Sequence, residues 1–257
     1  MAKKYEIGED AVFGWRKRIG YISPTVMEVL PYEFYKFAPE GVGLVGVTCM
    51  IDDWRPEEFE KGLAQVRNAA AYLGSRNVDF VIHGGGPLVV ARGPGYEETI
   101  VSEISAAAGV PATTGVRSCM EALRAVKAER IVIASPYPPQ HDAALAGYLK
   151  TFGFDVIEAR GANLPFKDIQ VQSPREIYDF VKRLVADNPK CDTVYLACPQ
   201  WQASQIVTEI EQDTGRTAVA YTHANFYVAC KAMGSAFEIL GKGRLLASIS
   251  SCATRGA

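Results

Sequence analysis

Short apolar runs rich in β-branched residues alternate along this chain with longer segments whose apolar residues recur at helical spacing. The runs that we expect to form strands are residues 18–23, 43–49, 78–83, 130–135, 155–159, 193–198 and 218–221. The segments that we expect to form helices are residues 56–73, 97–108, 118–126, 142–152, 174–186, 203–212 and 226–240. Because parallel strands need a crossover that returns over the sheet, this alternation predicts βαβ units and the α/β class.

The chain also repeats itself. The stretch RIGYISP at residues 18–24 lies over RIVIASP at 130–136, an offset of 112 residues, and residues 79–86 lie over 192–199 at an offset of 113. We therefore expect two pseudo-symmetric Rossmann-like (flavodoxin-like) halves, each a parallel-sheet α/β/α unit. The first half comprises residues 1–115 plus 226–257 with a C-terminal helix, and the second comprises residues 116–225. Ligands bind at the carboxyl ends of such strands, so we expect the active site in the cleft between the halves.

Composition narrows the classes of function. The chain has 257 residues, and 27 Lys and Arg against 29 Asp and Glu leave a net charge of −2, without the basic excess of a nucleic-acid-binding protein. No apolar run is long enough to span a bilayer and no signal-peptide core is present, so we expect a cytoplasmic protein without a membrane partner. Six scattered cysteines and three histidines have neither disulfide-scaffold nor zinc-ligand spacing. These exclusions leave chemistry on a small molecule as the expected function. They do not decide whether the chain forms a homo-oligomer.

Cys198 is the cysteine whose position most favours chemistry. It ends an apolar strand and precedes a predicted helix, where backbone N–H groups and the helix dipole lower the pKa of a thiol. The alternative is a small buried apolar side chain, the commoner role of such a residue. In the repeat Cys198 lies over Gly85, so one half has a thiol at the position where the other half has only the hydrogen atom of a glycine. Cys49, at the end of another strand, is a weaker candidate.

A glycine-rich turn follows the strand expected at residues 78–83. Gly84, Gly85 and Gly86 permit close approach of a ligand to the main chain, and we expect them to bind substrate. The turn lacks the spacing of a dinucleotide-binding loop, no helix is expected directly after it, and no Gly-Lys-Ser/Thr of a phosphate loop follows. His83, just before the glycines, is either an acid/base group at the rim of the cleft or a structural histidine.

Hydroxyl-bearing residues follow other strands. The repeat places Ser23-Pro24-Thr25 over Ser135-Pro136-Tyr137, so Ser23 and Pro24 are expected at the cleft together with Tyr137. The Tyr137 phenol is either a donor to an oxyanion or part of a surface. Thr113 and Thr114, and residues 222–225 in the second half, are either helix N-caps or carboxylate-binding residues.

These features together resemble the aspartate/glutamate racemase superfamily, specifically its arylmalonate decarboxylase and maleate isomerase branch. The resemblance runs from about residue 18 to residue 246 and is most specific at residues 81–95, 130–137, 196–198 and 243–245. It implies catalysis without cofactor or metal, with Tyr137 as the family's tyrosine donor. It also implies that Phe166 and Ile169 form an apolar pocket for the departing carboxylate, and that Asn163 matches an asparagine of the isomerases.

The resemblance implies a lyase more than an isomerase. Racemases and maleate isomerases of the superfamily use two cysteines, whereas this chain has Cys198 and Gly85, as in arylmalonate decarboxylases. We expect decarboxylation of a small substituted-malonate-like diacid through an enediolate that Cys198 protonates. The alternatives are a maleate isomerase-like cis–trans isomerase or a hydrolase, with Cys198 as covalent nucleophile, and a non-catalytic paralogue that binds small carboxylates.

This chain departs from the family at several oxyanion donors. Gly86 and Pro87 replace hydroxyl-bearing residues of the decarboxylases, Pro199 offers no N–H, and Met27 replaces an asparagine of the isomerases. We expect other groups to compensate, and the candidates are His83, Arg117 and the pair Thr113 and Thr114.

Overall fold

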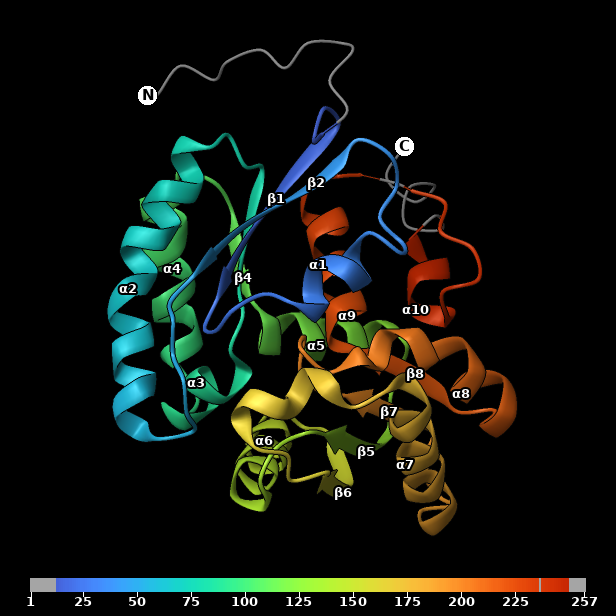
Figure 1. Cartoon of the computed structure of the whole chain (residues 1–257). Helices are drawn as coiled ribbons and strands as arrows, with labels where there is room; N and C mark the ends of the chain where they lie inside the picture. Colours follow the sequence, from blue (N-terminus) through green and yellow to red (C-terminus); the bar gives the residue numbers. More distant parts are fainter. Residues whose placement is uncertain (1–12, 236, 250–257) are drawn as a thin grey trace.

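The computed structural model describes residues 13–235 and 237–249 and contains two four-stranded parallel sheets (Figure 1). The first sheet has the order β2-β1-β3-β4 and the second β6-β5-β7-β8, so corresponding strands hold corresponding places. The strands of the first sheet are β1 (Lys17–Ser23), β2 (Val42–Thr48), β3 (Phe80–His83) and β4 (Ala112–Thr114). Those of the second are β5 (Arg130–Ser135), β6 (Asp155–Gly161), β7 (Thr193–Leu196) and β8 (Thr217–Ala220). The predicted duplicated parallel-sheet fold is confirmed.

One hydrogen bond, present in both halves, explains why the repeat survives in the sequence. The carboxylate of Asp79, just before β3, accepts the backbone N–H of Arg18 at the start of β1, with N···O 2.8 Å. In the second half the carboxylate of Asp192 accepts the N–H of Arg130, also at 2.8 Å. The matched residues therefore align the first residues of two neighbouring strands in each half.

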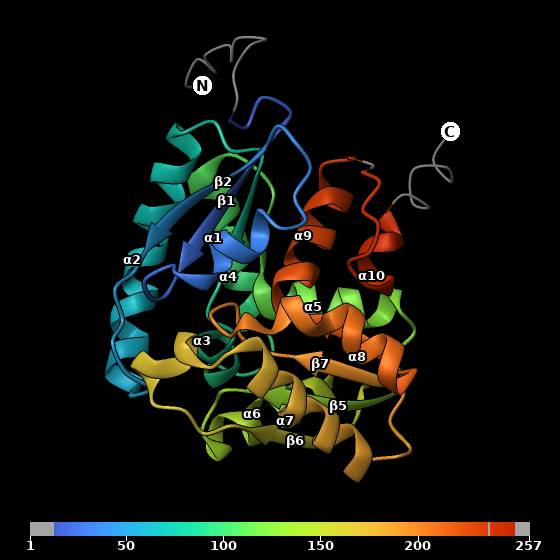
Figure 2. The same cartoon turned by 45° about the vertical axis from the view of Figure 1, so that its right-hand side comes forward.

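Helices surround both sheets. Two of them, α2 (Pro56–Ser75) and α4 (Tyr96–Ala108), pack together over one face of the first sheet, while α5 (Gly115–Ala125) and α9 (Tyr221–Ala232) lie between the sheets (Figures 1 and 2). The second half adds α6 (Pro139–Thr151), η1 (Phe166–Val171), α7 (Pro174–Asp187), η2 (Gln202–Ile206) and α8 (Val207–Thr214). The remaining helices are α1 (Val29–Phe34), α3 (Gly86–Ala91) and α10 (Arg244–Ala247).

The side chains of β1 alternate between two hydrophobic cores, one on each face of the first sheet. Ile19 and Tyr21 enter the large central core shared with the second half, whereas Ile22 packs with α2 and α4. On β3, Ile82 likewise faces the central core and Val81 faces the core under α2 and α4. Successive side chains of a strand point to opposite faces, so residue 83 points away from the central core.

The expectations for several elements were wrong. A helix does start directly after the glycine turn, because Gly85 adopts a φ of 74° and α3 begins at Gly86. Residues 222–225 are not N-caps but lie inside α9, whose N-cap is Ala220. This helix ends at Ala232 instead of continuing to residue 240, and Gly234 follows with a φ of 60°. The short elements β4, α1 and α10 were not expected.

The predicted division of the chain into halves stays a prediction, and the structure gives the places of the strands along the chain. All four strands of the first sheet lie before residue 115, and all four of the second lie between residues 116 and 225. The assignment of residues 226–257 to the first half stays a prediction, and its last eight residues lie outside the described part of the chain.

Candidate functional site

A cavity of about 290 Å³ lies between the halves at the carboxyl ends of the strands. Eight of the residues expected at the site line it: Ser23, Pro24, Gly85, Gly86, Tyr137, Phe166, Ile169 and Cys198. They come from both sheets, because the strand-end loops of the two halves face each other there. The duplication therefore brings residues together that lie more than 170 positions apart in the sequence.

Gly85 and Cys198 have matching backbone conformations. Their φ angles are 74° and 88°, both in the left-handed region, which few residues other than glycine adopt. A Cβ added at Gly85 would meet Pro24 Cγ at 3.1 Å and Leu88 Cδ1 at 3.3 Å, a tight but not a closed space. The second half keeps this strained conformation with a side chain, and so the cavity has a thiol on one wall and hydrogen at the equivalent place.

The Cys198 thiol is buried, with only 7% of the residue exposed. Burial raises its pKa to about 12, although the backbone N–H groups of Gln200 and Trp201 and the phenol of Tyr137 hydrogen-bond to the sulfur. The expected lowering of this pKa was therefore wrong, because loss of hydration outweighs the local donors. At neutral pH the group is a protonated thiol, and the same donors stabilise the thiolate once it has given up its proton.

Tyr137 is positioned by two buried groups of its own half. Its backbone N–H donates to Ser135 Oγ at 2.9 Å, and that hydroxyl donates to Asp142 Oδ1 at 2.5 Å. Asp142 lies in the first turn of α6, and burial raises its pKa to about 6. The pKa of the Tyr137 phenol is raised well above its ordinary value by burial, so this group is a neutral hydrogen-bond donor.

An aromatic wall that the sequence analysis missed closes one side of the cavity. Trp54, in the loop between β2 and α2, lies with its ring centroid 4.7 Å from that of Phe166 and 5.3 Å from that of Tyr137. It comes from the first half and the other two rings from the second. Trp54 follows the predicted strand end at residue 49 by five residues, and no spacing in the sequence indicates that its side chain turns to the cavity.

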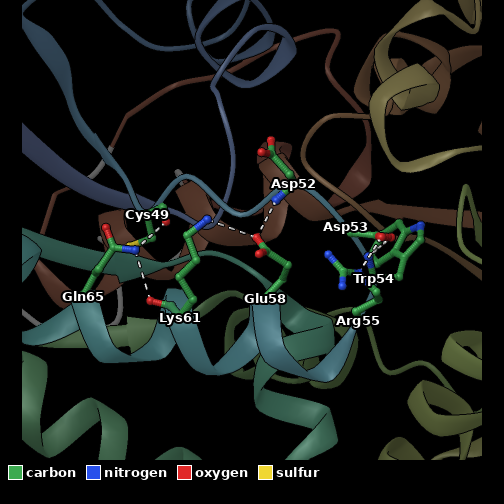
Figure 3. Close-up of polar contacts among 8 residues, drawn as sticks. All are labelled: Cys49, Asp52, Asp53, Trp54, Arg55, Glu58, Lys61 and Gln65. Carbon is green, nitrogen blue, oxygen red and sulfur yellow. Dashed lines mark hydrogen bonds and ion pairs between the residues drawn. The ribbon is translucent and has the colours of Figure 1, made fainter.

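Side chains at the start of α2 hold the loop that carries Trp54 (Figure 3). The N–H of Asp52 donates to Glu58 Oε2 at 3.0 Å, and Gln65 Nε2 donates to the carbonyl oxygen of Cys49 at 2.7 Å. Cys49 is buried, does not line the cavity, and has its thiol pKa raised to about 11 by burial. The geometry therefore gives no support to a chemical role for Cys49.

The charged and polar lining is sparse. Among the described residues that line the cavity, Lys167 is the one cation, and Glu28 and Asp52 are the acids. Thr25 adds a hydroxyl beside Ser23. A small anionic ligand would thus meet one lysine, two acids, the hydroxyls of Ser23, Thr25 and Tyr137, and a largely apolar surface.

Gln200 joins the halves at the edge of the cavity. Its Oε1 accepts the N–H groups of Val29 and Leu30 at 3.2 and 3.3 Å, and its Nε2 donates to the carbonyl oxygen of Val26. Gln200 thereby caps the start of α1 in the first half with a residue two positions after Cys198. No pattern in the sequence pointed to this contact.

His83 is not brought to the cavity. It ends β3, lies in register with Thr114 of β4, and points to the face covered by α2 and α4. Burial lowers its pKa to about 4, and its Nδ1 has no hydrogen-bond partner. The geometry does not support the expected acid/base role, because the imidazole is buried on the wrong face of the sheet.

Four further candidates have structural positions away from the cavity. Gly84 makes room for Tyr21, because an added Cβ would lie 2.5 Å from the phenol oxygen. Thr114 is the N-cap of α5, and its hydroxyl donates to Glu97 Oε1 at 2.8 Å. Thr113 is buried beside it, and Asn163 is exposed in a loop with a φ of 52°. Arg117, expected to compensate with Thr113 and Thr114, does not line the cavity either.

Within residues 13–235 and 237–249, no helix combines the length and apolarity needed to cross a bilayer. Over the same residues, no group of three or more His, Cys, Asp and Glu side chains is arranged to hold a metal ion.

Comparison with known proteins gives consistent matches over most of the chain. A sequence model of the arylmalonate decarboxylase family matches residues 19–246. The maleate isomerase of Pseudomonas putida is 27% identical over 199 residues, which are 75% of this chain and 79% of that protein. The arylmalonate decarboxylase of Bordetella bronchiseptica is 24% identical over 235 residues, which are 88% and 95% of the two chains.

Solved structures of both enzymes have the same fold. A variant of a Pseudomonas putida maleate isomerase with maleate has a TM-score of 0.84 at 17% identity, covering 90% of this chain and 97% of that one. A variant of arylmalonate decarboxylase in the liganded form has a TM-score of 0.83 at 20% identity, covering 89% and 98%. A Nocardia farcinica maleate cis-trans isomerase variant, with a covalently bound succinylcysteine intermediate, has a TM-score of 0.82 at 17% identity, covering 90% and 98%.

Proposed function

The chain belongs to the arylmalonate decarboxylase family, and on that premise we propose that it decarboxylates a small substituted malonate without a cofactor. The observation that carries the proposal is the pairing of Cys198 with Gly85 across the cavity. Racemisation needs an acid and a base on opposite faces of the substrate, whereas decarboxylation followed by protonation needs one proton donor. One buried, protonated thiol suits the second reaction.

The proposed reaction begins with one carboxylate of the diacid against the apolar part of the cavity, which Phe166 and Ile169 line. Its C–C bond breaks, CO₂ leaves, and the electron pair remains on the substrate as an enediolate. The hydroxyls of Ser23 and Thr25 and the phenol of Tyr137 are the proposed donors to the enediolate oxygens. These side chains replace the donors missing at Gly86 and Pro87.

Proton transfer completes the proposed reaction. The Cys198 S–H gives its proton to the enediolate carbon, leaving a thiolate that the N–H groups of Gln200 and Trp201 and the phenol of Tyr137 stabilise. Solvent returns a proton to the sulfur after the product leaves. The sum is one malonate dianion and one proton converted into one monocarboxylate anion and CO₂.

The aromatic wall indicates what kind of substituent the substrate carries. Trp54 and Phe166 pack edge to face on each other and both line the cavity, which gives an aromatic surface suited to an aromatic or branched apolar group. A cavity of about 290 Å³ accommodates a diacid with one such substituent. We therefore propose aryl- or alkyl-substituted malonates as the substrate class.

The experiment is an assay of CO₂ release from a panel of substituted malonates with the wild-type protein, Cys198→Ser and Cys49→Ser. We expect Cys198→Ser to slow turnover by about 10²–10⁴-fold, the usual contribution of a general acid. Cys49→Ser is the matched control, because Cys49 is buried outside the cavity, and it should keep its activity. Full turnover by Cys198→Ser would overturn the proposal.

A maleate isomerase-like reaction with Cys198 as covalent nucleophile is the second candidate. The three hydrogen bonds to the sulfur favour it, because they stabilise the thiolate that such a mechanism uses. The same panel should therefore include maleate, with intact-mass measurement during turnover. A Cys198 adduct would identify the nucleophile, and tight binding without turnover of any diacid would identify a carboxylate-binding paralogue.

A further inference from the structure

A second cavity, of about 270 Å³, lies apart from the first and shares no lining residue with it. Its wall is formed by the residues after α1, by η2, α8 and α9, and by the segment before α10. The polar side chains of that wall are Lys36, Ser204, Gln205, Thr208, His223 and Lys242. None of them has a part in the proposed reaction.

The lining of this second cavity is positively charged. It contains two lysines and no acidic side chain. Within the described part of the chain neither Lys36 nor Lys242 has an ion-pair partner among the salt bridges. The Lys36 ammonium rests 4.6 Å from the centroid of the Tyr32 ring, a weak contact at an exposed position. Both ammonium groups thus remain able to bind an anion.

Both carboxylate oxygens of Glu33, a buried acid of α1, accept hydrogen bonds. Its Oε1 accepts the N–H of Ser204 at 3.0 Å, and its Oε2 accepts the hydroxyl of Thr222 at 3.2 Å. It does not line the cavity. Glu33 is therefore held by hydrogen bonds outside the lining of the second cavity, and so is buried Glu211, which accepts the N–H of Arg244 at 3.0 Å.

His223 adds an uncharged polar group at the base of the cavity. The residue is 1% exposed, its ring packs edge-to-face on Phe37 with centroids 4.8 Å apart, and its Nδ1 has no hydrogen-bond partner. Burial and the neighbouring Lys242 lower its pKa to about 3, so the imidazole is neutral. Buried polar atoms in proteins usually have partners, and an unpartnered one beside two lysines calls for an explanation.

The hydroxyl of Ser204 and the side-chain amide of Gln205 add donors to the two ammonium groups. Ser204 and Gln205 come from η2, and Thr208 from the first turn of α8. The Thr208 hydroxyl donates to the carbonyl oxygen of Gly241 at 3.1 Å, which fastens the segment carrying Lys242 to α8. Two separate segments of the chain, the residues after α1 and the segment before α10, thus bring one lysine each to the same cavity.

We propose that this second cavity binds a small oxyanion, the phosphate or carboxylate group of a metabolite, between Lys36 and Lys242 with His223 beneath it. Ammonium and hydroxyl donors in a concave site are the groups that recognise such oxygens. The volume suits a small metabolite and not a nucleotide. The site is independent of the decarboxylation proposed for Cys198, and either proposal can fail alone.

The test is calorimetric titration of the full-length protein with inorganic phosphate in one arm and succinate in the other. We expect saturable binding of at least one anion, weakened tenfold or more in the double variant Lys36→Gln/Lys242→Gln. Lys242→Arg should retain binding, because it keeps the charge. Tighter binding of phosphate or of succinate identifies which of the two groups the cavity selects.

Two controls separate this site from other cationic places. Lys167→Gln removes the lysine of the first cavity, and Lys190→Gln removes an exposed lysine elsewhere. Both should bind anion at the second cavity as the wild type does, and the imidazole ¹⁵N signals of His223 should shift on titration. Absence of saturable binding of both anions, or unchanged affinity in the double variant, would overturn the proposal.

Discussion

Gly85 and Cys198 occupy the same left-handed conformation at equivalent strand ends, with φ angles of 74° and 88°. Of the two, only Cys198 carries a side chain that can move a proton. The duplicated fold thus places one thiol, and not two, at the matching strand ends beside the cavity. The proposed one-sided protonation depends on this difference between the halves.

Restoring the missing thiol is therefore informative. Gly85→Cys should fold, because Cys198 tolerates the same backbone angle, with a loss of stability of about 1–3 kcal/mol for a strained residue. The variant should exchange the α-hydrogen of a chiral monoacid product with deuterium from D₂O and racemise it, which wild type should not. Gly85→Ala carries the same strain without the thiol and is the control. Equal exchange by both variants would show that the thiol is not the cause.

We expect Asp142 to affect the proposed reaction through Tyr137, because the Ser135 hydroxyl connects the two. Tyr137→Phe should lower kcat by about 10²–10³-fold, the usual loss for one oxyanion donor. Asp142→Ala removes the acceptor of the Ser135 hydroxyl and should lower kcat by about tenfold with little change in KM. In the double variant the second change should add little, because both act on one phenol. Additive losses in this kinetic cycle would show that Asp142 acts by another route.

Glu33 makes stability depend on pH. Burial raises its pKa from 4.5 to about 7, so the folded protein holds a proton that the unfolded chain loses between those values. The free energy of unfolding should therefore fall as pH rises from about 4.5 to 7, by about 3 kcal/mol from this group. Glu33→Gln keeps an acceptor for the Ser204 N–H and should flatten the dependence.

Urea denaturation at pH 5, 6, 7 and 8 measures this effect, with Glu40→Gln as the exposed control. Glu40→Gln should retain the wild-type slope. The same slope in Glu33→Gln would exclude Glu33 as its source.

Gln200 should contribute to the stability of the junction between the halves. Gln200→Leu leaves the N–H groups of Val29 and Leu30 without their acceptor, and we expect a loss of about 1–3 kcal/mol in the free energy of unfolding. Gln212→Leu, on the exposed side of α8, is the control and should change stability by less than about 0.5 kcal/mol. Equal effects of the two substitutions would contradict the account of this junction.

Much of the fold could be predicted because the repeat preserves residues with a local task. Arg18 with Asp79, and Arg130 with Asp192, align neighbouring strands in each half, so the matches mark real structural equivalences. The offset of 113 residues also identifies Gly85 and Cys198 as equivalent positions from the sequence alone. In contrast, α9 is buried on nearly all sides and so lacks the amphipathic pattern by which the other helices were recognised.

Site residues that depend on packing across the halves could not be predicted. Trp54 and Gln200 reach the cavity through loops whose direction is set by tertiary contacts, and no spacing in the sequence records that. His83 was misplaced because the face to which a strand-end residue points depends on which face meets the central core. The pKa of Cys198 was misjudged because its burial, invisible in the sequence, outweighs the N–H donors beside it.

The most direct test of the central claim is the stereochemistry of decarboxylation in D₂O. A prochiral disubstituted malonate is incubated with the wild-type protein, and the monoacid product is analysed by chiral chromatography and mass spectrometry. Delivery of one proton by Cys198 to one face predicts a single enantiomer carrying one deuterium. A racemic product, or the same enantiomer formed at an unchanged rate by Cys198→Ser, would contradict the account.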